Sequence, residues 1–517
     1  MNDQIDYLVL GSGLSALTFS ALMARKKAKV KILEAHEFFG GYGHTFAVGQ
    51  YRFNAQFHYV ASCGEGGIVN QFLKKLGLDK EITFNRFDAE GYDRVYCGQK
   101  KLLIPYGYDQ LQKNMLEMCP EASKEVINFV DLLKAFGKAA DCFPRHLHQS
   151  YQMLKAIPSY WKLFKYREAT LQDVFDACHL PKILQTLVAG QLIDYMLPPK
   201  DLSFLVWAAL FNAYYNGAYY PAKHYEGVIE GIVKSIQNDG GELYSNERVV
   251  EFITEGKTVK GVYTQSVDPE TGMFSGPKKA HYAKNIICNF DPKTAAEMIS
   301  LDKFSKKVRH ALDYDYSYSS FVLYGVVKDI DLRKYGFGNW NIWHCEEDHN
   351  TAFKAMYEDC DYSKPHFAMN SKSLQTEDSG NCNREGCLNF QICTVANYEY
   401  WKTLKLRDPK AYNIKKKEVL DQLLDVVEKH YVPGIREHLV LKMTGSPTTN
   451  ERYVNSPLGS SYGVNLTPRN FQYSNKLTSH TSLDNFYFCS AASGAAGFSG
   501  TISTGVQLYE KFTGDYL

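Results

Sequence analysis

The first 34 residues contain the pattern that most restricts how this chain can fold. Residues 5–10 are a short apolar run rich in β-forming side chains, and they lead into Gly11-Ser12-Gly13-Leu14-Ser15-Ala16. A helical segment over 17–25 and a second apolar run over 30–33 follow, and the second run ends at Glu34. A strand, a glycine turn, a helix, a strand and an acid in this order are the fingerprint of a dinucleotide-binding βαβ unit.

Each position of this fingerprint has a physical role. Gly11 permits the tight turn, Gly13 lets the backbone approach a pyrophosphate, and Ala16 keeps the helix close to the strand. The start of the helix offers free N–H groups and partial positive charge to phosphates. Glu34, 21 residues after Gly13, can accept a hydrogen bond from a ribose hydroxyl. An ordinary βα turn is the alternative, but the second strand and the acid favour a bound dinucleotide.

A glycine pair, Gly40-Gly41, follows shortly after Glu34 and precedes Tyr42-Gly43-His44-Thr45-Phe46. Two glycines let a loop pack against a long cofactor without Cβ clashes, although a plain turn would explain the pair by itself. Coupled to the upstream fingerprint, this stretch resembles the FAD-binding half of the amine-oxidase and phytoene-desaturase superfamily. The resemblance implies that the cofactor is FAD.

Composition limits the classes of protein to consider. With 517 residues the chain is too long for one ordinary core, so two or three domains are expected. Hydrophobic residues make up 45% and charged residues 22%, which is typical of a folded globular protein. The net charge of +1 gives no support for nucleic acid as a partner.

The twelve cysteines are far apart and form no Cys-x-x-Cys pair. Without a secretory signal before the first strand, they indicate reduced thiols and a cytoplasmic protein. The nearest approaches to a metal-ligand cluster are His344-Cys345 with His349, and Cys382 with Cys387. Neither has zinc-ligand spacing, so no metal is expected.

Membrane association depends on one segment. The longest apolar run, 202–215, is too short to span a bilayer and is interrupted by polar residues, so it predicts a buried helix. Residues 145–167 combine aromatic and aliphatic side chains with Lys155, Lys162, Lys165 and Arg167, and contain no acid. Such a stretch suits a peripheral position in a membrane interface. A core helix with a solvated face is the alternative, and both stay open.

Hydrophobic periodicity predicts helices over 121–138, 227–237 and 418–431, and a helix-rich region between the first of these and about residue 215. Short β runs are expected between 243 and 262 and over 283–289, and 318–396 is expected to be largely β. A strand at 486–489 leads into a Gly/Ala/Ser-rich tract that predicts a tightly packed helix.

Motifs along the whole chain narrow the resemblance. They are His44-Thr45-Phe46 with Phe57-His58-Tyr59, Ile104-Pro105-Tyr106-Gly107, Leu187-Val188-Ala189-Gly190-Gln191 with Asp194-Tyr195, and Gly217-Ala218-Tyr219-Tyr220-Pro221. They are similar to motifs of the retinol saturase branch, close to the carotenoid isomerases and phytoene desaturases. In that family a strand contacts the FAD adenine through a valine backbone, and Val249 is the match. Ile287-Cys288-Asn289 resembles a further family motif.

Three places depart from the family pattern: Asn54-Ala55-Gln56, Pro221-Ala222-Lys223-His224 and Cys489-Ser490-Ala491-Ala492. In the family these places border the flavin ring or its ribityl chain. Phosphate and adenosine contacts lie elsewhere, so FAD binding is still expected. The departures leave open whether the chain performs the family's chemistry.

The resemblance implies an α/β fold with a Rossmann-like FAD-binding domain built from three chain segments. We expect residues 1–108, 224–292 and 446–517 in that domain, and 109–223 and 293–445 in a substrate domain with a helical cap and a β-sheet.

The resemblance also implies a reaction, hydride transfer at flavin N5 on double bonds of an extended apolar polyene or unsaturated lipid. Saturation, desaturation and redox-neutral isomerisation stay open. The alternatives are an amine or amino-acid oxidase, and a non-catalytic flavin- or lipid-binding protein.

The expected site residues follow from the same resemblance. Tyr219 and Tyr220 are expected to line the ring, with His58, Lys223 and His224 as candidates for proton transfer or flavin tuning. The cofactor-binding residues are expected to be Gly11, Gly13, Leu14, Ser15, Ala16, Glu34, Ala35, Gly40, Gly41, His44, Thr45, Val249, Asn289, Ala492, Gly497, Gly500 and Thr501. The sequence does not identify the substrate, the electron partner or the oligomeric state.

Overall fold

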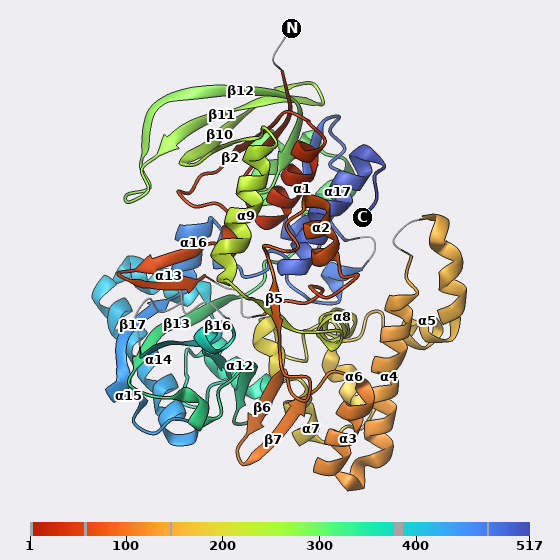
Figure 1. Ribbon diagram of the computed structural model, residues 1–517, viewed down its shortest axis with the longest axis vertical. Coiled ribbons are helices and arrows are strands. Elements are labelled where there is room, and N and C mark those ends of the chain that lie inside the picture. The colour runs from red at the N-terminus through yellow and green to blue at the C-terminus, as the bar shows by residue number, and fades with distance from the viewer. Residues whose placement is uncertain (1–3, 56–58, 145–146, 377–385, 473–474) are drawn as a thin grey trace.

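The computed structural model describes residues 4–55, 59–144, 147–376, 386–472 and 475–517. Two seven-stranded sheets organise the molecule. In Figure 1 the first sheet lies in the upper part, near both chain termini, and the second lies below it. A group of helices from the first half of the chain occupies the lower right.

The first sheet is mostly parallel and is assembled from three separate parts of the chain. Its parallel strands run in the order β9 (Glu242–Tyr244), β2 (Val30–Leu33), β1 (Ile5–Leu10), β12 (Phe274–Cys288) and β18 (Phe486–Phe488). The long strand β12 also continues into an antiparallel meander with β11 (Thr258–Val267) and β10 (Glu247–Glu255). The predicted βαβ start is therefore completed by a middle and a C-terminal segment.

Helix α1 (Leu14–Arg25) is buried along its whole length except at Arg25. It packs against α17 (Phe498–Thr513) and α9 (His224–Asn238). The approach to α17 is close: a Cβ added at Gly505 would lie 2.5 Å from the Ser15 carbonyl oxygen. This contact accounts for the small residues of the C-terminal tract, and it confirms the predicted tightly packed helix.

The second sheet has the strand order β17 (Leu439–Gly445), β13 (Ser319–Lys328), β16 (Cys387–Ala396), β15 (Phe367–Asn370), β14 (Asn341–Cys345), β6 (Asp93–Cys97) and β7 (Lys100–Ile104). Residues 93–104 thus differ from the expectation that places them in the FAD-binding domain. They form a hairpin whose strand β6 pairs in parallel with β14. A hairpin is a local pattern, and it carries no signal about which sheet it will join.

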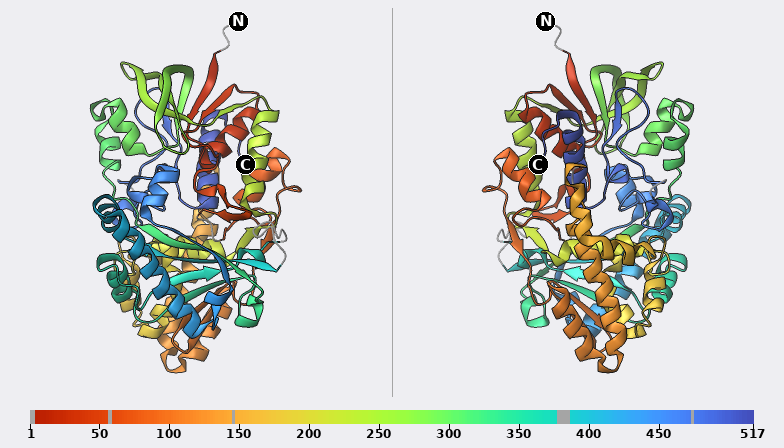
Figure 2. Two further views of the ribbon diagram at one scale, coloured as in Figure 1. Left: turned by 90° about the vertical axis from the view of Figure 1, so that its left-hand side faces the viewer. Right: turned by 90° about the vertical axis from the view of Figure 1, so that its right-hand side faces the viewer.

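Helices cover both sides of this sheet. On one side lie α13 (Tyr398–Arg407), α14 (Pro409–His430) and α15 (Ile435–His438). The other group contains α3 (Tyr108–Met118), α4 (Ser123–Asp141), α5 (Ile157–Phe164), α6 (Leu171–Ala177), α7 (Lys182–Val188) and α8 (Phe204–Tyr215). The right-hand view of Figure 2 shows α3, α4 and α5 facing the viewer along one side of the molecule. The mixed α/β class is confirmed.

The remaining described elements connect these layers. They include α2 (Ile68–Leu76), α10 (Pro292–Ile299), α11 (Lys306–Ala311), α12 (His349–Glu358) and α16 (Pro447–Val454), together with the small pairs β3 (Thr45–Val48) with β4 (Tyr51–Asn54) and β5 (Phe84–Arg86) with β8 (Tyr219–Pro221). Among the described residues, no helix has both the length and the apolar character that crossing a bilayer would require.

Candidate active site

A cavity of about 530 Å³ lies at the carboxyl end of β1, where the predicted fingerprint turns into α1. Three stretches of the first 44 residues line it, namely 11–15, 34–36 and 40–44, together with the distant residues 247–249. The ends of β12 and β18 contribute 289–292 and 490–492. We refer to it as the cofactor cavity. Its position, outside the carboxyl ends of parallel strands and in front of a helix N-terminus, suits an anionic dinucleotide.

Glycines let backbone segments approach one another closely around the cofactor cavity. Gly11 has φ +96°, a conformation that other residues rarely adopt. A Cβ on Gly13 would lie 2.6 Å from Asn289 Oδ1, and one on Gly41 would lie 3.3 Å from Gly13 Cα. Asn289 fixes the turn, because its Oδ1 accepts a hydrogen bond from the Gly13 N–H at 2.7 Å. Backbone therefore forms the cradle, as close contact with a pyrophosphate requires.

Glu34 lies at the far end of this cradle and is held in place. Its Oε2 accepts hydrogen bonds from the Ser12 N–H at 2.7 Å and from the Ser12 hydroxyl at 2.5 Å, while Oε1 accepts from the His36 N–H at 2.8 Å. Burial raises the pKa of Glu34 above its ordinary value. Burial, and secondarily the neighbouring His44, lowers the pKa of His36 to about 4. The imidazole is therefore neutral at physiological pH.

Most of the predicted cofactor-binding residues line the cofactor cavity: Gly11, Gly13, Leu14, Ser15, Glu34, Ala35, Gly40, Gly41, His44, Val249, Asn289, Ala492 and Thr501. Ala16 is buried in α1, and Thr45 begins β3. Gly497 and Gly500 lie along a second cavity instead. The contact of each residue with a bound cofactor stays a prediction.

The second cavity is larger, about 830 Å³, and we refer to it as the substrate cavity. One face of α8 forms much of its wall. The residues on this face recur at helical spacing and are apolar: Leu205, Val206, Ala209, Leu210 and Ala213. Tyr214 of α8 and aromatic rings from other elements complete the lining, including Tyr59, Phe136, Tyr195 and Tyr462. Such a cavity suits a long apolar ligand.

The two cavities meet. Six residues line both of them: Tyr42, Ser461, Tyr462, Ala491, Ala492 and Thr501. Burial raises the pKa of both phenols, Tyr42 and Tyr462, so each stays protonated. The Ser461 hydroxyl is buried and has no hydrogen-bond partner within the described part of the chain. A polar atom left open at a cradle of glycines fits a group with polar edges, such as a flavin ring at the junction.

The predicted catalytic residues lie elsewhere. Tyr220 is buried, and its hydroxyl lies 2.8 Å from Nδ1 of His224, whose pKa burial lowers to about 3. Tyr219 is half-buried, and Lys223 is exposed in front of α9. Among the described residues, none of these four lines either cavity. His58 lies outside the described residues. A role at the ring stays a prediction for all five and receives no support from the geometry.

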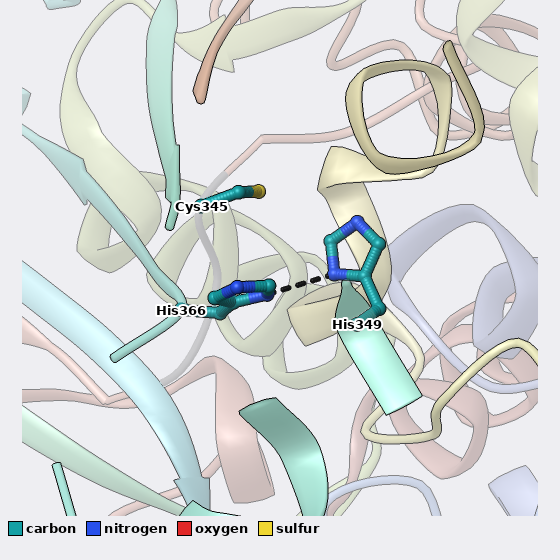
Figure 3. Close-up of side chains that lie close together, drawn as sticks. All are labelled: Cys345, His349 and His366. Atoms are coloured by element: carbon teal, nitrogen blue, oxygen red, sulfur yellow. Dashed lines mark hydrogen bonds between the residues drawn. The ribbon is translucent and has the colours of Figure 1, made fainter. Parts of the chain in front are cut away.

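Within the described part of the chain, one cluster of potential metal ligands is present (Figure 3): Cys345, His349 and His366 are buried, and their ligand atoms lie within 4.8 Å of one another. Its hydrogen bonds form a chain with one direction. His349 Nε2–H donates to the Thr186 carbonyl at 2.8 Å, so His349 Nδ1 accepts from His366 Nδ1–H, also at 2.8 Å. His366 Nε2 then accepts from the Glu346 N–H. All four ring nitrogens are engaged, and a metal ion would have to displace these bonds.

Several wall residues were not predicted from the sequence, among them Arg248, Tyr42 and Tyr462. Asp194 appears in the sequence only as part of a motif without a role, yet it lines the substrate cavity. Its position inside an apolar stretch is the signal that could have singled it out, because an unpaired buried carboxyl is costly and points to function.

The fold and the glycine cradle are those of a Rossmann-type protein in which a second cavity adjoins the first. Comparisons with known proteins agree. Residues 9–76 match the family described as NAD(P)-binding Rossmann-like domain. The chain is 22% identical over 539 residues to the all-trans-retinol 13,14-reductase of Danio rerio, covering 97% of this chain and 84% of that protein. It is also 22% identical to the chloroplastic prolycopene isomerase of Daucus carota, over 89% and 72% of the two chains.

Solved structures share the fold. An oxidoreductase from Methanosarcina mazei superposes with a TM-score of 0.60 at 12% identity, covering 98% of this chain and 100% of that one. A putrescine oxidase bound to putrescine gives 0.63 at 11% identity, over 99% of both chains. Rab GDI from Plasmodium falciparum gives 0.51 at 12% identity, over 99% of both. At these identities the likeness concerns the fold alone.

Together these comparisons confirm the resemblance to the retinol saturase and carotenoid isomerase branch of the superfamily, and with it the expectation of an enzyme. The match of residues 9–76 to an NAD(P)-binding Rossmann-like domain agrees with the expectation of a dinucleotide cofactor, and its identity as FAD stays a prediction.

Proposed function

We propose that the protein is an FAD-dependent oxidoreductase or isomerase that acts on carbon–carbon double bonds of an extended apolar polyene or unsaturated lipid. The observation that carries this proposal is the meeting of the two cavities along Tyr42, Tyr462 and the Ala491-Ala492 turn. A long apolar ligand in the substrate cavity would end against a ring placed at this junction. The names of the relatives, which refer to retinol and prolycopene, support the same class of ligand.

The residues that would hold FAD follow from the cofactor cavity. The turn around Gly13 and the start of α1 would receive the pyrophosphate, Glu34 the adenosine ribose, and Val249 the adenine. A bound flavin supplies hydride transfer at its N5 atom. The chain's own contribution is to hold the ligand over the ring and to exclude water, which the aromatic and aliphatic lining of the substrate cavity favours.

We propose further that the ligand enters from a membrane surface. Large apolar side chains of residues 143–164 are exposed: Phe143, Tyr151, Leu154, Ile157, Trp161 and Phe164. Trp161 is 75% exposed, and Lys162, Lys165 and Arg167 are close to it in sequence. Phe143 and Arg167 also line the substrate cavity. An apolar patch with a basic border beside the cavity mouth suits an anionic bilayer that dissolves the ligand.

An anaerobic single-turnover measurement tests the proposed reaction. The flavin of the purified protein is reduced with dithionite and mixed with all-trans-retinol or prolycopene, and flavin absorbance and product mass are followed. Oxidation of the flavin with a product two hydrogens heavier would indicate saturation. A rearranged product of unchanged mass, with the flavin still reduced, would indicate isomerisation. In a parallel run without dithionite, reduction of the oxidised flavin by the polyene would indicate desaturation.

The alternatives give different outcomes. An amine or amino-acid oxidase, which shares the fold, would have its oxidised flavin reduced by amines and would ignore polyenes. A non-catalytic protein would bind flavin or a polyene without turnover in any direction. Either result would contradict the proposed function.

A further inference from the structure

Two buried carboxyl groups lie together beside the substrate cavity. One is Asp93 on β6, and the other is Asp194 at the end of a short 3-10 helix, η4 (Gly190–Asp194). Gly190 allows the close approach, since a Cβ there would lie 2.3 Å from a methyl carbon of Val95. Gln191 donates a hydrogen bond to Asp93. The motif that contains Gln191 therefore brings Asp194 close enough to Asp93 for the two carboxyl charges to interact.

The surroundings of Asp93 stabilise a negative charge. Its carboxylate is fully buried and accepts hydrogen bonds from the Tyr59 hydroxyl at 3.0 Å and from Asn341 Nδ2 at 3.2 Å, in addition to Gln191. Burial raises its pKa, but only to about 6, because these donors and Trp343 oppose the effect. Asp93 is thus ionised near neutral pH.

Asp194 has the opposite surroundings. It is 9% exposed, it lines the substrate cavity, and its Oδ2 atom is buried without a hydrogen-bond partner among the described residues. Burial and then the negative charge of Asp93 raise the pKa of Asp194 well above its ordinary value, and Tyr59 and Lys372 offset this only in part. When two neighbouring carboxyls have such different surroundings, the proton resides on the poorly solvated one.

Asp194 also lies beside the junction of the cavities. Its charge would act on the phenol of Tyr462, which lines both of them. The other titratable groups that interact with Asp194 are Tyr59, Asp93, Tyr195, Tyr214, Lys372 and Cys393. Burial raises the pKa of each of the three tyrosines and of Cys393, so these groups stay neutral and uncharged beside the acid.

We propose that Asp194 is the catalytic acid that exchanges a proton with a carbon of the bound double bond, and that Asp93 is a positioning residue that keeps this proton on Asp194. The inference rests on the proposed function and deepens it. In a saturation, one alkene carbon would receive a hydride from the reduced flavin, and the other would receive the proton of the Asp194 carboxyl group. The π bond breaks, two C–H bonds form, the flavin loses two electrons, and solvent reprotonates the carboxylate. Isomerisation uses the same acid to protonate and then deprotonate one carbon.

The protonation state is tested without any turnover. At about pH 8 the infrared spectrum of the flavin-loaded protein should contain the carbonyl band of a buried protonated carboxylic acid, and Asp194→Asn should remove it. Asp131→Asn, which changes an exposed carboxyl on α4, should leave the band intact. Because a raised pKa lowers stability as pH increases, the melting temperature of Asp194→Asn should rise relative to the wild type from about pH 5 to about pH 8. A wild-type spectrum without the band would overturn the proposal.

The catalytic step is tested with all-trans-retinol or prolycopene in deuterated water. Asp194→Asn should keep its flavin and its affinity for the polyene, while the rate of deuterium transfer to carbon falls by about 10²–10⁴-fold. Transfer at the wild-type rate would contradict the role of Asp194. A wild type that binds flavin but converts no polyene would instead contradict the proposed function, and the infrared band would still decide where the proton resides.

Discussion

The two cavities differ in how the chain builds them. The cofactor cavity is made largely of backbone, and its key contacts involve glycines within the first 41 residues. The substrate cavity is made of side chains from α4, α8 and the C-terminal third, which come together only in the folded molecule. Where closely packed backbone forms the wall, an added side chain would clash, so substitutions are poorly tolerated. A side-chain cavity can be reshaped by single substitutions, so it is where members of such a fold can differ in substrate.

The largest effect should come from the backbone cradle. Gly13→Ala would place a methyl group 2.6 Å from Asn289 Oδ1 and displace the turn. Loss of charge-assisted hydrogen bonds to the pyrophosphate should weaken FAD binding by about 10- to 100-fold, as measured by titration of the apoprotein. Gly227→Ala on α9, where an added Cβ meets nothing closer than 3.9 Å, is the control and should bind FAD normally. Equal FAD affinity in both variants would contradict the claim that the backbone around Gly13 contacts the pyrophosphate.

The exposed patch should matter next. Trp161→Ser with Phe164→Ser should weaken binding to anionic liposomes by about 30-fold, because two large rings no longer enter the interface. Binding should also weaken with added salt. Leu406→Ser, at an equally exposed apolar residue of α13, should bind liposomes as the wild type does. Liposome binding at the wild-type level in the double variant would contradict a membrane-facing patch.

Reshaping the substrate cavity should separate it from the cofactor cavity. Ala213→Phe adds a ring to the α8 face that lines the substrate cavity and should reduce affinity for all-trans-retinol by about tenfold. Flavin content should not change. Ala140→Phe, at an exposed position of α4, serves as the control. Loss of flavin together with polyene affinity in Ala213→Phe would show that the cavities are not separate sites.

The last effect concerns the stability of the fold in acid rather than binding. Burial lowers the pKa of His349 from 6.5 to about 4, so this group stabilises the fold above pH 6.5 and the contribution is lost as pH falls toward 4. The free energy of unfolding should fall by about 1.4 kcal/mol per pH unit from this one group in that range. His349→Gln should remove that slope in denaturant titrations. As the control, His310→Gln at an exposed position should leave the slope as it is in the wild type. An unchanged slope in His349→Gln would contradict the neutral histidine chain.

Much of the fold could be predicted because its signals are local. The βαβ start and the small residues of α17 each follow from a short pattern with one physical reason, whereas Val249 on β10 was expected only from the family resemblance. The membership of β6 and β7 in the second sheet could not be predicted, since pairing with β14 joins residues about 250 positions apart. Likewise, the proposed role of Asp194 could not be predicted, because it depends on the hydrogen-bond donors to Asp93, which come from distant parts of the chain. Lys223, expected at the ring from the family resemblance, is exposed in front of α9.

The central claim is that a flavin ring and an apolar polyene meet where the two cavities join. A crystal structure with FAD and all-trans-retinol tests it most directly. The account predicts the ring against Tyr42, Tyr462 and Ala491-Ala492, with the polyene along α8 and one of its double bonds about 3–3.5 Å from flavin N5. A ring bound away from this junction, or a polyene bound outside the substrate cavity, would contradict it.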